Sequence, residues 1–330
     1  MLFRSYDGAL AVAREQVEFG AHVLDVCVAL TERTDEAEQI ATLTKKLAMG
    51  VEAPLMIDST EADAVEAALA HYPGRAIVNS INMEAGRQRI DTVVPIVMKH
   101  GAAVVALTID EDGMAKTAEQ KLAVATKIHD IACGEYGLDP GALIFDALTF
   151  PLSTGDDDLR LDAKHTIDAI RRIKAEIPGC FTTLGVSNVS FGLKPAARHA
   201  LNSVFLHECV QAGLDSAIVH AGKIVPLARM PEEHKQICLD LIYDRRSNDY
   251  DPLKKLLEVF EDVTTVATVR EDRSGWTIEQ LLKQRIIDGD REGLTDDLER
   301  AMSEGLAPLS IVNDVLLDGM KVVEIGRAHV

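Results

Sequence analysis

The sequence predicts an α/β protein: a (βα)8 barrel of the TIM type that lacks its first strand, followed by a truncated all-α helical cap. Two observations predict this fold. Strand-like and helix-like patterns alternate with little filler from residue 6 to about residue 245, and four of the apolar runs end in an acid or an amide. Repeated βα units with buried strands require a parallel sheet, which is either doubly wound or closed into a barrel.

The barrel elements follow one another along the chain as helix and strand in turn. Helices are expected at 7–19, 35–49, 61–71, 87–100, 117–135, 161–176 and 196–212. Strands are expected at 21–28, 54–60, 76–82, 102–110, 142–150, 180–189 and 216–222. An eight-stranded barrel needs one strand more than these seven. Since the chain opens on a helix, we expect the missing strand to be the first one.

Three further helix patterns with short links indicate most of a helical bundle. Gly289 and Gly305 stand where helices are expected to stop, and Pro308 begins the last helix. The predicted apolar stripes are Ile278, Leu281, Leu282 and Ile286, then Leu294, Leu298 and Met302, then Leu309, Val312, Leu316, Met320 and Val323. We therefore expect a barrel domain at 1–262, a linker at 263–275 and a partial helical cap at 276–330.

The two chain ends do not continue the patterns of their neighbours. The first five residues, MLFRS, and the last seven, EIGRAHV, can be encoded by the two complementary strands of one DNA word, AGATCGGAAGAG. That word resembles a common sequencing-library adapter. We therefore expect 1–5 and 324–330 to be foreign to the rest of the chain, and we leave them out of the fold prediction.

Composition limits the classes of function. The 330 residues carry a net charge of −19, which argues against binding to nucleic acid or to an anionic membrane, since both need basic patches. No apolar run approaches the ~20 residues of a membrane span, and no signal peptide is recognisable. The five cysteines are scattered, and Cys27 and Cys180 lie in apolar runs typical of buried thiols. A reduced, cytoplasmic protein is expected.

The polar strand ends are the candidate site. Asp58, Asn79, Asp146 and Asn188 close four strand-like runs, and the carboxyl ends of barrel strands form the active face. Two acids could serve acid–base chemistry or a magnesium ion, whereas two neutral amides without histidine make a poor transition-metal set, and no metal is expected. A planar heterocycle fits better, because acids accept paired N–H donors along a ring edge and amides both donate and accept.

Three weaker candidates lie near these strand ends. Asp25 ends the first strand-like run and could join the polar ring. Ser80 flanks Asn79, and its role could be limited to shaping the turn. Arg198 follows the Asn188 loop and could meet a substrate carboxylate, although a charge on the helix surface is the commoner situation.

The motifs MIDST, IVNSI, LIFDALTFPLSTG and LGVSNVSFGL, in this order, resemble the pterin-binding barrel of the cobalamin-dependent methionine synthase family. The similarity runs from about residue 6 to about residue 323. The final helices, with PLSIVNDVLLDGMKVV, resemble the helical cap that precedes the cobalamin-binding domain in that family. The resemblance implies a methyltransferase of one-carbon metabolism that takes the N5 methyl group of methyltetrahydrofolate and passes it to cob(I)alamin on a corrinoid-carrying domain.

The family roles can be carried over by motif. Asp58, Asn79 and Asp146 would hold the pterin ring, and Asn188 would hydrogen-bond near N5 as the catalytic residue. N5 must be protonated before its methyl group departs, because a tertiary amine is a poor leaving group. An asparagine cannot supply that net proton, but it can accept a hydrogen bond from protonated N5.

The resemblance also implies what lies elsewhere. In the family a homocysteine domain holds zinc, and most of the cobalamin contacts come from a later domain, so this region would perform one half-reaction of methionine synthesis. Two alternatives remain. A dihydropteroate synthase-like enzyme would need basic residues for pyrophosphate and no helical cap. A non-catalytic pterin-binding or corrinoid-docking module would bind folate without transferring the methyl group.

Overall fold

The computed structural model describes residues 6–29, 34–261, 263, 275–288 and 293–319. Two compact units share the chain: Met1–Ile224 with Glu233–Val266, and Val225–Glu232 with Ala267–Val330. The expected foreign ends, and all of the expected linker except residues 263 and 275, lie outside the described residues. No helix in the described part of the chain is both long and apolar enough to cross a membrane.

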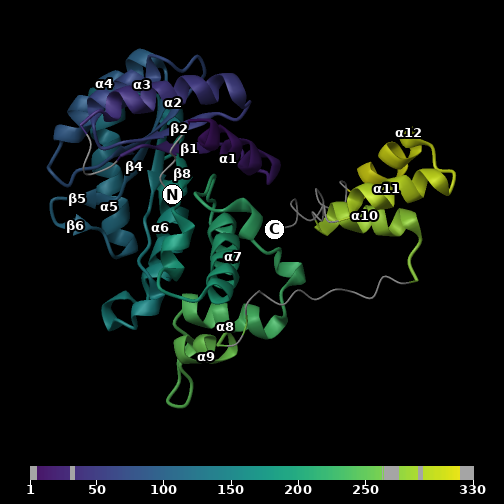
Figure 1. Cartoon of the computed structure of the whole chain (residues 1–330). Coiled ribbons are helices and arrows are strands. Elements are labelled where there is room, and N and C mark those ends of the chain that lie inside the picture. Colours follow the sequence, from purple (N-terminus) through teal and green to yellow (C-terminus); the bar gives the residue numbers. More distant parts are fainter. Residues whose placement is uncertain (1–5, 30–33, 262, 264–274, 289–292, 320–330) are drawn as a thin grey trace. The chain divides into compact units, whose positions relative to one another are not determined.

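The first unit is built on a parallel sheet whose strands follow chain order (Figure 1). The strands are β1 (Leu24–Cys27), β2 (Leu55–Asp58), β3 (Ile77–Ile81), β4 (Ala103–Leu107), β7 (Leu143–Asp146) and β8 (Phe181–Thr183). Neighbours in the sequence are neighbours in the sheet, with no reversal of strand order. This is barrel-type winding, because a doubly wound sheet reverses its strand order at a switch point. The predicted α/β class is confirmed.

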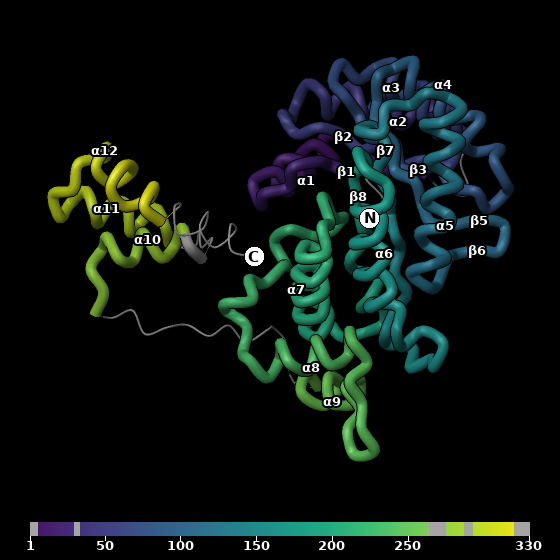
Figure 2. The backbone as a smooth tube through the Cα atoms, turned by 180° about the vertical axis from the view of Figure 1, so that it is seen from behind, coloured from purple at the N-terminus to yellow at the C-terminus, as the bar shows by residue number. Residues whose placement is uncertain are grey.

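The helices of the first unit lie outside the strands (Figures 1 and 2), and most of the first seven pack against the next helix along the chain. They are α1 (Tyr6–Glu18), α2 (Glu36–Gly50), α3 (Ala62–Leu69), α4 (Gln88–His100), α5 (Ala118–His129), α6 (Asp162–Glu176), α7 (Pro195–Gln211), α8 (Glu232–Ile242) and α9 (Pro252–Val259). The expected helix at 117–135 continues from α5 as a π-helix, Asp130–Glu135. The short hairpin β5 (Ile109–Asp110) and β6 (Gly113–Met114) was not expected.

Burial along the strands follows from this layering. β7 is buried along its whole length and β4 along all but its last residue, because helices cover one face and the interior of the sheet covers the other. β1 differs, since Leu24 and Val26 are buried whereas Asp25 and Cys27 are exposed. No described residue pairs with β1 on its far side. The expectation of a buried Cys27 thiol is therefore wrong, although Cys180 is buried as expected.

The seventh strand-like run, 216–222, forms an isolated bridge between Ile218 and Gly185 in place of a strand. Backbone bonds still join it to β8, from Ser216 N to Thr182 O (3.1 Å) and from Ile218 N to Leu184 O (2.9 Å). The Thr182 N–H, however, donates to the Asp215 carboxylate at 2.7 Å. A side-chain oxygen thus takes the place of a backbone carbonyl, and a regular ladder does not start there.

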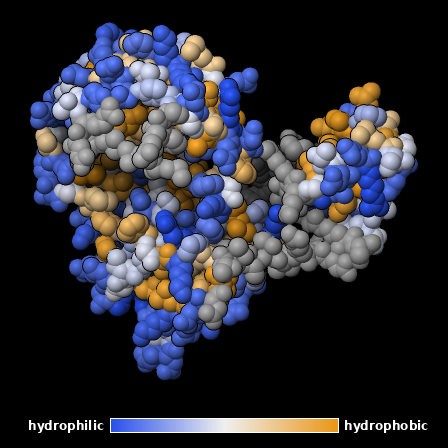
Figure 3. Space-filling model, viewed as in Figure 1, coloured by the Kyte–Doolittle hydropathy of each residue, from blue (hydrophilic) through white to orange (hydrophobic). Residues whose placement is uncertain are grey.

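The second unit is a small helical cluster of α10 (Ile278–Asp288), α11 (Leu294–Ser303), α12 (Pro308–Ser310) and the π-helix η8 (Ile311–Leu316). Its core consists of Ile278, Leu282, Ala301, Ile311 and Val315. The predicted stripe is therefore wrong in part, because Met302, Leu309 and Val312 are exposed. Leu294, Leu298 and Leu316 of the predicted stripes do pack against this core, whereas Ala301, Ile311 and Val315 belong to it without having been predicted. Orange apolar residues accordingly gather on this unit in Figure 3. Met320 and Val323 lie outside the described residues.

The Asp215 carboxylate should stabilise the end of the sheet by binding Thr182 of β8 and Lys174 of α6. Besides Thr182 N it accepts from Thr182 Oγ1 (3.0 Å) and Lys174 Nζ (2.9 Å). We expect Asp215→Ala to lower the free energy of unfolding by about 1–3 kcal/mol, because buried donors lose their acceptor. Circular dichroism should follow the transition, since the single tryptophan, Trp276, belongs to the second unit. Asp112→Ala, in the exposed β5–β6 turn, is the control. An equal fall in the free energy of unfolding in both variants would contradict this role of Asp215.

Candidate active site

Three of the predicted site residues project from one face of the sheet at its carboxyl end. Asp58 of β2 pairs in register with Asn79 of β3, and Asn79 pairs with Val105 of β4. Two residues further along β4, Leu107 pairs with Asp146 of β7. Residues two apart on a strand point to the same side, and partners in register share that side. Asp58, Asn79 and Asp146 therefore share the face that also bears the exposed Cys27, the partner of Asp58 in β1.

Asp146 is the most enclosed of the four. It is 5% exposed, and its Oδ1 accepts the Leu148 N–H at 2.7 Å, while the Gly185 N–H also donates to it. Burial raises the pKa of Asp146 to about 6, against the lowering effect of these N–H groups and of the Lys121 charge. At neutral pH the Asp146 side chain is mostly ionised, and it takes up a proton on mild acidification.

The acids near β1 influence one another. Burial, and then the charge of Glu36, raise the pKa of Asp58, and a hydrogen bond with the Cys27 thiol opposes that rise. Asp25 still reaches solvent, yet protein atoms surround much of it, and this burial together with the Asp58 charge raises its pKa to about 6. Asp25 also lines a cavity of about 410 Å³ between α1, α2 and β1. It therefore connects the polar face to a groove along the unpaired edge of β1.

Arg89 holds the segments that follow Asp58 and Asn79. Its guanidinium donates to Ser59 O (2.7 Å), Thr60 O (2.6 Å) and Ser80 O (3.1 Å). These carbonyls belong to the turns after β2 and β3, so one side chain fixes both. The contact of Ser80 with Arg89 is through its backbone, and a role for its hydroxyl stays a prediction.

Asn188 lies on a short 3-10 helix, Val186–Ser190, directly after β8, and its side chain is exposed. Its N–H donates to Gly185 O at 3.2 Å, and a methyl group on Gly185 would lie 3.2 Å from Asn188 Nδ2. Since Gly185 also donates to Asp146, this glycine joins the last strand end to the buried acid. Arg198 of α7 secures the loop through Ser190 Oγ (3.2 Å) and Ser187 O (3.3 Å). Two of its donors are thus occupied, and a contact with substrate stays a prediction.

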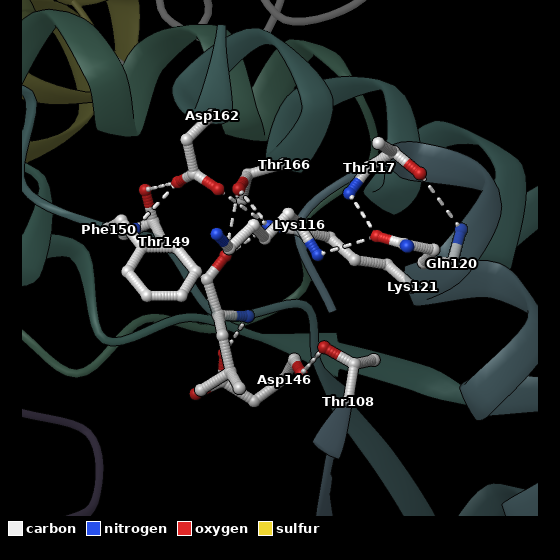
Figure 4. A network of polar contacts seen from close by, with 11 residues as sticks. Thr108, Lys116, Thr117, Gln120, Lys121, Asp146, Thr149, Phe150, Asp162 and Thr166 are labelled. Atoms are coloured by element: carbon white, nitrogen blue, oxygen red, sulfur yellow. Dashed lines mark hydrogen bonds and ion pairs between the residues drawn. The ribbon is translucent and has the colours of Figure 1, made fainter. Parts of the chain in front are cut away.

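A buried charged network supports the loop after β7, and the sequence patterns did not reveal it (Figure 4). Lys121 of α5 faces Asp162 of α6 at 3.4 Å, and neither side chain is more than 1% exposed. Lys121 lies in the buried stripe of its helix, beside Ala118, Leu122 and Ala125. A lysine at such an apolar position is the one signal by which the sequence could have marked this network.

The chemistry of the face is that of hydrogen-bond recognition. It offers carboxylates as acceptors and asparagine amides as both donors and acceptors. Among the described residues, no group of three or more histidine, cysteine, aspartate or glutamate side chains is placed to hold a metal ion. The arrangement can bind a flat ring with several N–H groups on one edge.

Both units of this chain are similar in sequence to known proteins. A family profile described as pterin binding enzyme matches residues 1–220, and one described as B12 binding domain matches residues 278–326. Methionine synthases from Mycobacterium tuberculosis and Mycobacterium leprae are each 47% identical to the chain, over 330 and 329 residues. Each match covers 98% of this chain, which spans 27% of the length of either relative.

Solved structures share the fold at lower identity. Dihydropteroate synthase from Stenotrophomonas maltophilia has a TM-score of 0.50 and 18% identity, over 79% of this chain and 89% of that one. DHPS from Yersinia pestis has a TM-score of 0.50 and 14% identity, over 74% and 90%. These likenesses bear on the fold alone, whereas the family profile covers residues 1–220 of 330. The chain belongs to the pterin-binding enzyme family.

Proposed function

We propose that this chain binds methyltetrahydrofolate through its pterin ring and transfers the N5 methyl group to cob(I)alamin, one half-reaction of methionine synthesis. The observation that carries the proposal is the shared face of Asp58, Asn79 and Asp146, beside the loop of Asn188. The 47% identity to two methionine synthases supports it. The reaction class is methyl transfer.

Each polar residue has a task in this proposal. The carboxylates of Asp58 and Asp146 accept N–H groups from the ring edge, and Asn79 supplies both a donor and an acceptor. The exposed Asn188 amide accepts a hydrogen bond from protonated N5, which stabilises the state from which the methyl group leaves. Oriented groups of this kind contribute a few kcal/mol to the reaction barrier.

The methyl acceptor is a corrinoid, presented by the second unit together with a corrinoid-carrying domain. The match of residues 278–326 to a B12 binding domain supports this assignment. So does the surface of the second unit, where Met302, Leu309, Val312 and Leu317 expose apolar side chains suited to covering a large macrocycle. The five cysteines are free thiols, which supports a reducing, cytoplasmic compartment for the reaction.

A dihydropteroate synthase-like reaction is less well supported. It would require basic side chains directed at pyrophosphate, but Lys194 donates to Glu261 O at 2.8 Å and Arg198 to the Asn188 loop. The likeness to dihydropteroate synthases concerns the fold alone. A pterin-binding module without turnover is the outcome that the next experiment separates from an enzyme.

The direct test is calorimetric binding of methyltetrahydrofolate, followed by single-turnover methyl transfer to added cob(I)alamin. We expect saturable binding and loss of the cob(I)alamin absorption. Binding without transfer would favour the docking module. If neither were observed, the proposed function would be wrong for this chain.

Two substitutions should separate recognition from catalysis. Asp146→Asn removes a charged acceptor, so we expect folate binding to weaken roughly ten- to a hundredfold. Asn188→Ala should slow methyl transfer by about 10²-fold or more and change binding far less. Calorimetry and single-turnover kinetics give the two quantities. Equal effects of both substitutions on binding, with no separate loss of rate, would refute the assigned roles.

The raised pKa of Asp146 predicts an acid limit to binding. Its carboxylate accepts ring N–H groups only when ionised, so affinity should be full above its pKa of about 6 and decline as pH falls through that value. Below it we expect about a tenfold loss per pH unit. Binding near pH 6 should release protons, which calorimetry in buffers of different ionisation enthalpy measures. An unchanged acid limit in Asp146→Asn would assign the titration to Asp25 or Asp58.

A further inference from the structure

The ammonium group of Lys121 is fully satisfied inside the protein. It lies 2.7 Å from Thr166 Oγ1, 3.0 Å from Leu148 O and 3.4 Å from Asp162 Oδ1. These three acceptors use its three N–H donors. Figure 4 shows Lys121 with Asp162 and Thr166, beside Thr149 and Phe150 of the loop that leaves β7.

The same network determines the path of that loop. Thr166 Oγ1 donates to Leu148 O at 2.8 Å, so this carbonyl accepts from two side chains. Asp162 Oδ2 accepts from Thr149 Oγ1 (3.0 Å) and from Phe150 N (2.6 Å). Leu148 has a φ of 55°, a left-handed conformation that a leucine adopts only at a cost. The network therefore holds the loop in a conformation that its sequence does not favour.

In that conformation the Leu148 N–H points back toward the Asp146 side chain. The N–H donates to Asp146 Oδ1 at 2.7 Å, and the Asp146 carbonyl accepts from Thr108 N (3.1 Å) and Thr108 Oγ1 (3.2 Å). The carboxylate is thus oriented from the loop and its backbone is held from β4. A chain of contacts leads from Lys121 through Leu148 to the acid of the polar face.

A buried ion pair is in general a weak source of net stability. Burial lowers the pKa of Lys121, which reflects the cost of keeping a cation away from water. Replacing a buried pair by apolar residues of similar volume is often neutral or stabilising. Apolar residues could not supply the hydrogen-bond partners that Leu148, Thr149 and Phe150 find in this network.

We propose that Lys121, Thr166 and Asp162 are positioning residues for pterin recognition. Lys121 and Thr166 hold the Leu148 carbonyl and Asp162 holds the next two residues of the loop, so that the Leu148 N–H stays on the Asp146 carboxylate. This inference rests on the proposed function for its ligand, but its geometry is that of the free protein. None of the three residues is expected to touch the ring.

The consequence appears in the titration of Asp146. The charges near it are Lys121 on α5 and, behind Lys121, Asp162 on α6, while Thr108 and Thr183 beside it are neutral. A variant that removes one of the two side-chain donors to the Leu148 carbonyl, without changing any charge, weakens the hold on the Leu148 N–H that favours the ionised acid. The pKa of Asp146 should then rise further.

Thr166→Val makes that change, and the chain offers a matched control. Thr166 and Thr44 are both fully buried in helices, but in the described part of the chain the Thr44 hydroxyl has no hydrogen-bond partner. Thr44→Val therefore removes a hydroxyl group that makes no hydrogen bond. Thr166→Ser keeps the hydroxyl group that binds the Leu148 carbonyl. Thr149→Val, which spares the Lys121 contacts, is the milder second variant should Thr166→Val not fold.

Two readouts decide the question on the full chain. Carbon-13 carboxyl titration by NMR, assigned with Asp146→Asn, should show the Asp146 midpoint moved upward in Thr166→Val and unchanged in Thr44→Val and Thr166→Ser. Calorimetry at pH 7.5 should show methyltetrahydrofolate binding weakened about five- to tenfold in Thr166→Val alone.

The outcomes separate this inference from the proposed function. An Asp146 midpoint that stays in place in both Thr166→Val and Thr149→Val would overturn the positioning role. A midpoint that moves while the unsubstituted chain binds no folate would overturn the function and leave the positioning of Asp146 intact. Equal weakening in Thr166→Val and Thr44→Val would show a general packing effect and contradict the inference.

Discussion

The site depends on basic side chains that bind backbone carbonyls in the loops behind it. Parallel strands buried on both faces end here in acids and amides, which are costly to bury unless their surroundings are fixed. Arg89 holds the turns after β2 and β3, Lys121 the loop after β7, and Arg198 the loop after β8. In a chain with a net charge of −19, these cations lie where a loop must keep one conformation.

This arrangement separates recognition from support. The groups that face the interior of the sheet are acids and neutral amides, whereas the neighbouring cations contact backbone carbonyls. An arginine or lysine placed directly beside Asp58 or Asp146 would compete with a ring for the carboxylate oxygens. By acting on the backbone, the cations orient the acids and leave their oxygens available to a ligand.

The sequence predicted the strand ends because each is a local pattern, an apolar run closed by a polar residue. Asp58, Asn79 and Asp146 could be placed at the carboxyl end of the sheet from that pattern alone, whereas their common side follows from the strand register. The contacts of Arg89 and Lys121 could not, since their partners are carbonyl groups that every residue carries. The failure at 216–222 has the same origin, because Asp215 replaces a backbone acceptor that no apolar pattern reports. In the second unit the stripes held at Leu294, Leu298 and Leu316 but failed at Met302, Leu309 and Val312, which are exposed.

Burial raises the pKa of both Asp25 and Asp146 to about 6, but their neighbours differ, and ligand binding should act on them differently. Asp146 is raised by burial and restrained by N–H donors, so further donors from a ring lower its pKa directly. Asp25 is raised by burial and by the charge on Asp58, and so depends on the state of its neighbour. A ring that pairs with Asp58 spreads that charge over its own N–H groups and eases the ionisation of Asp25 without touching it. The ionisation of Asp25 therefore depends on the charge of its neighbour on β2, whereas Asp146 responds to its own loop.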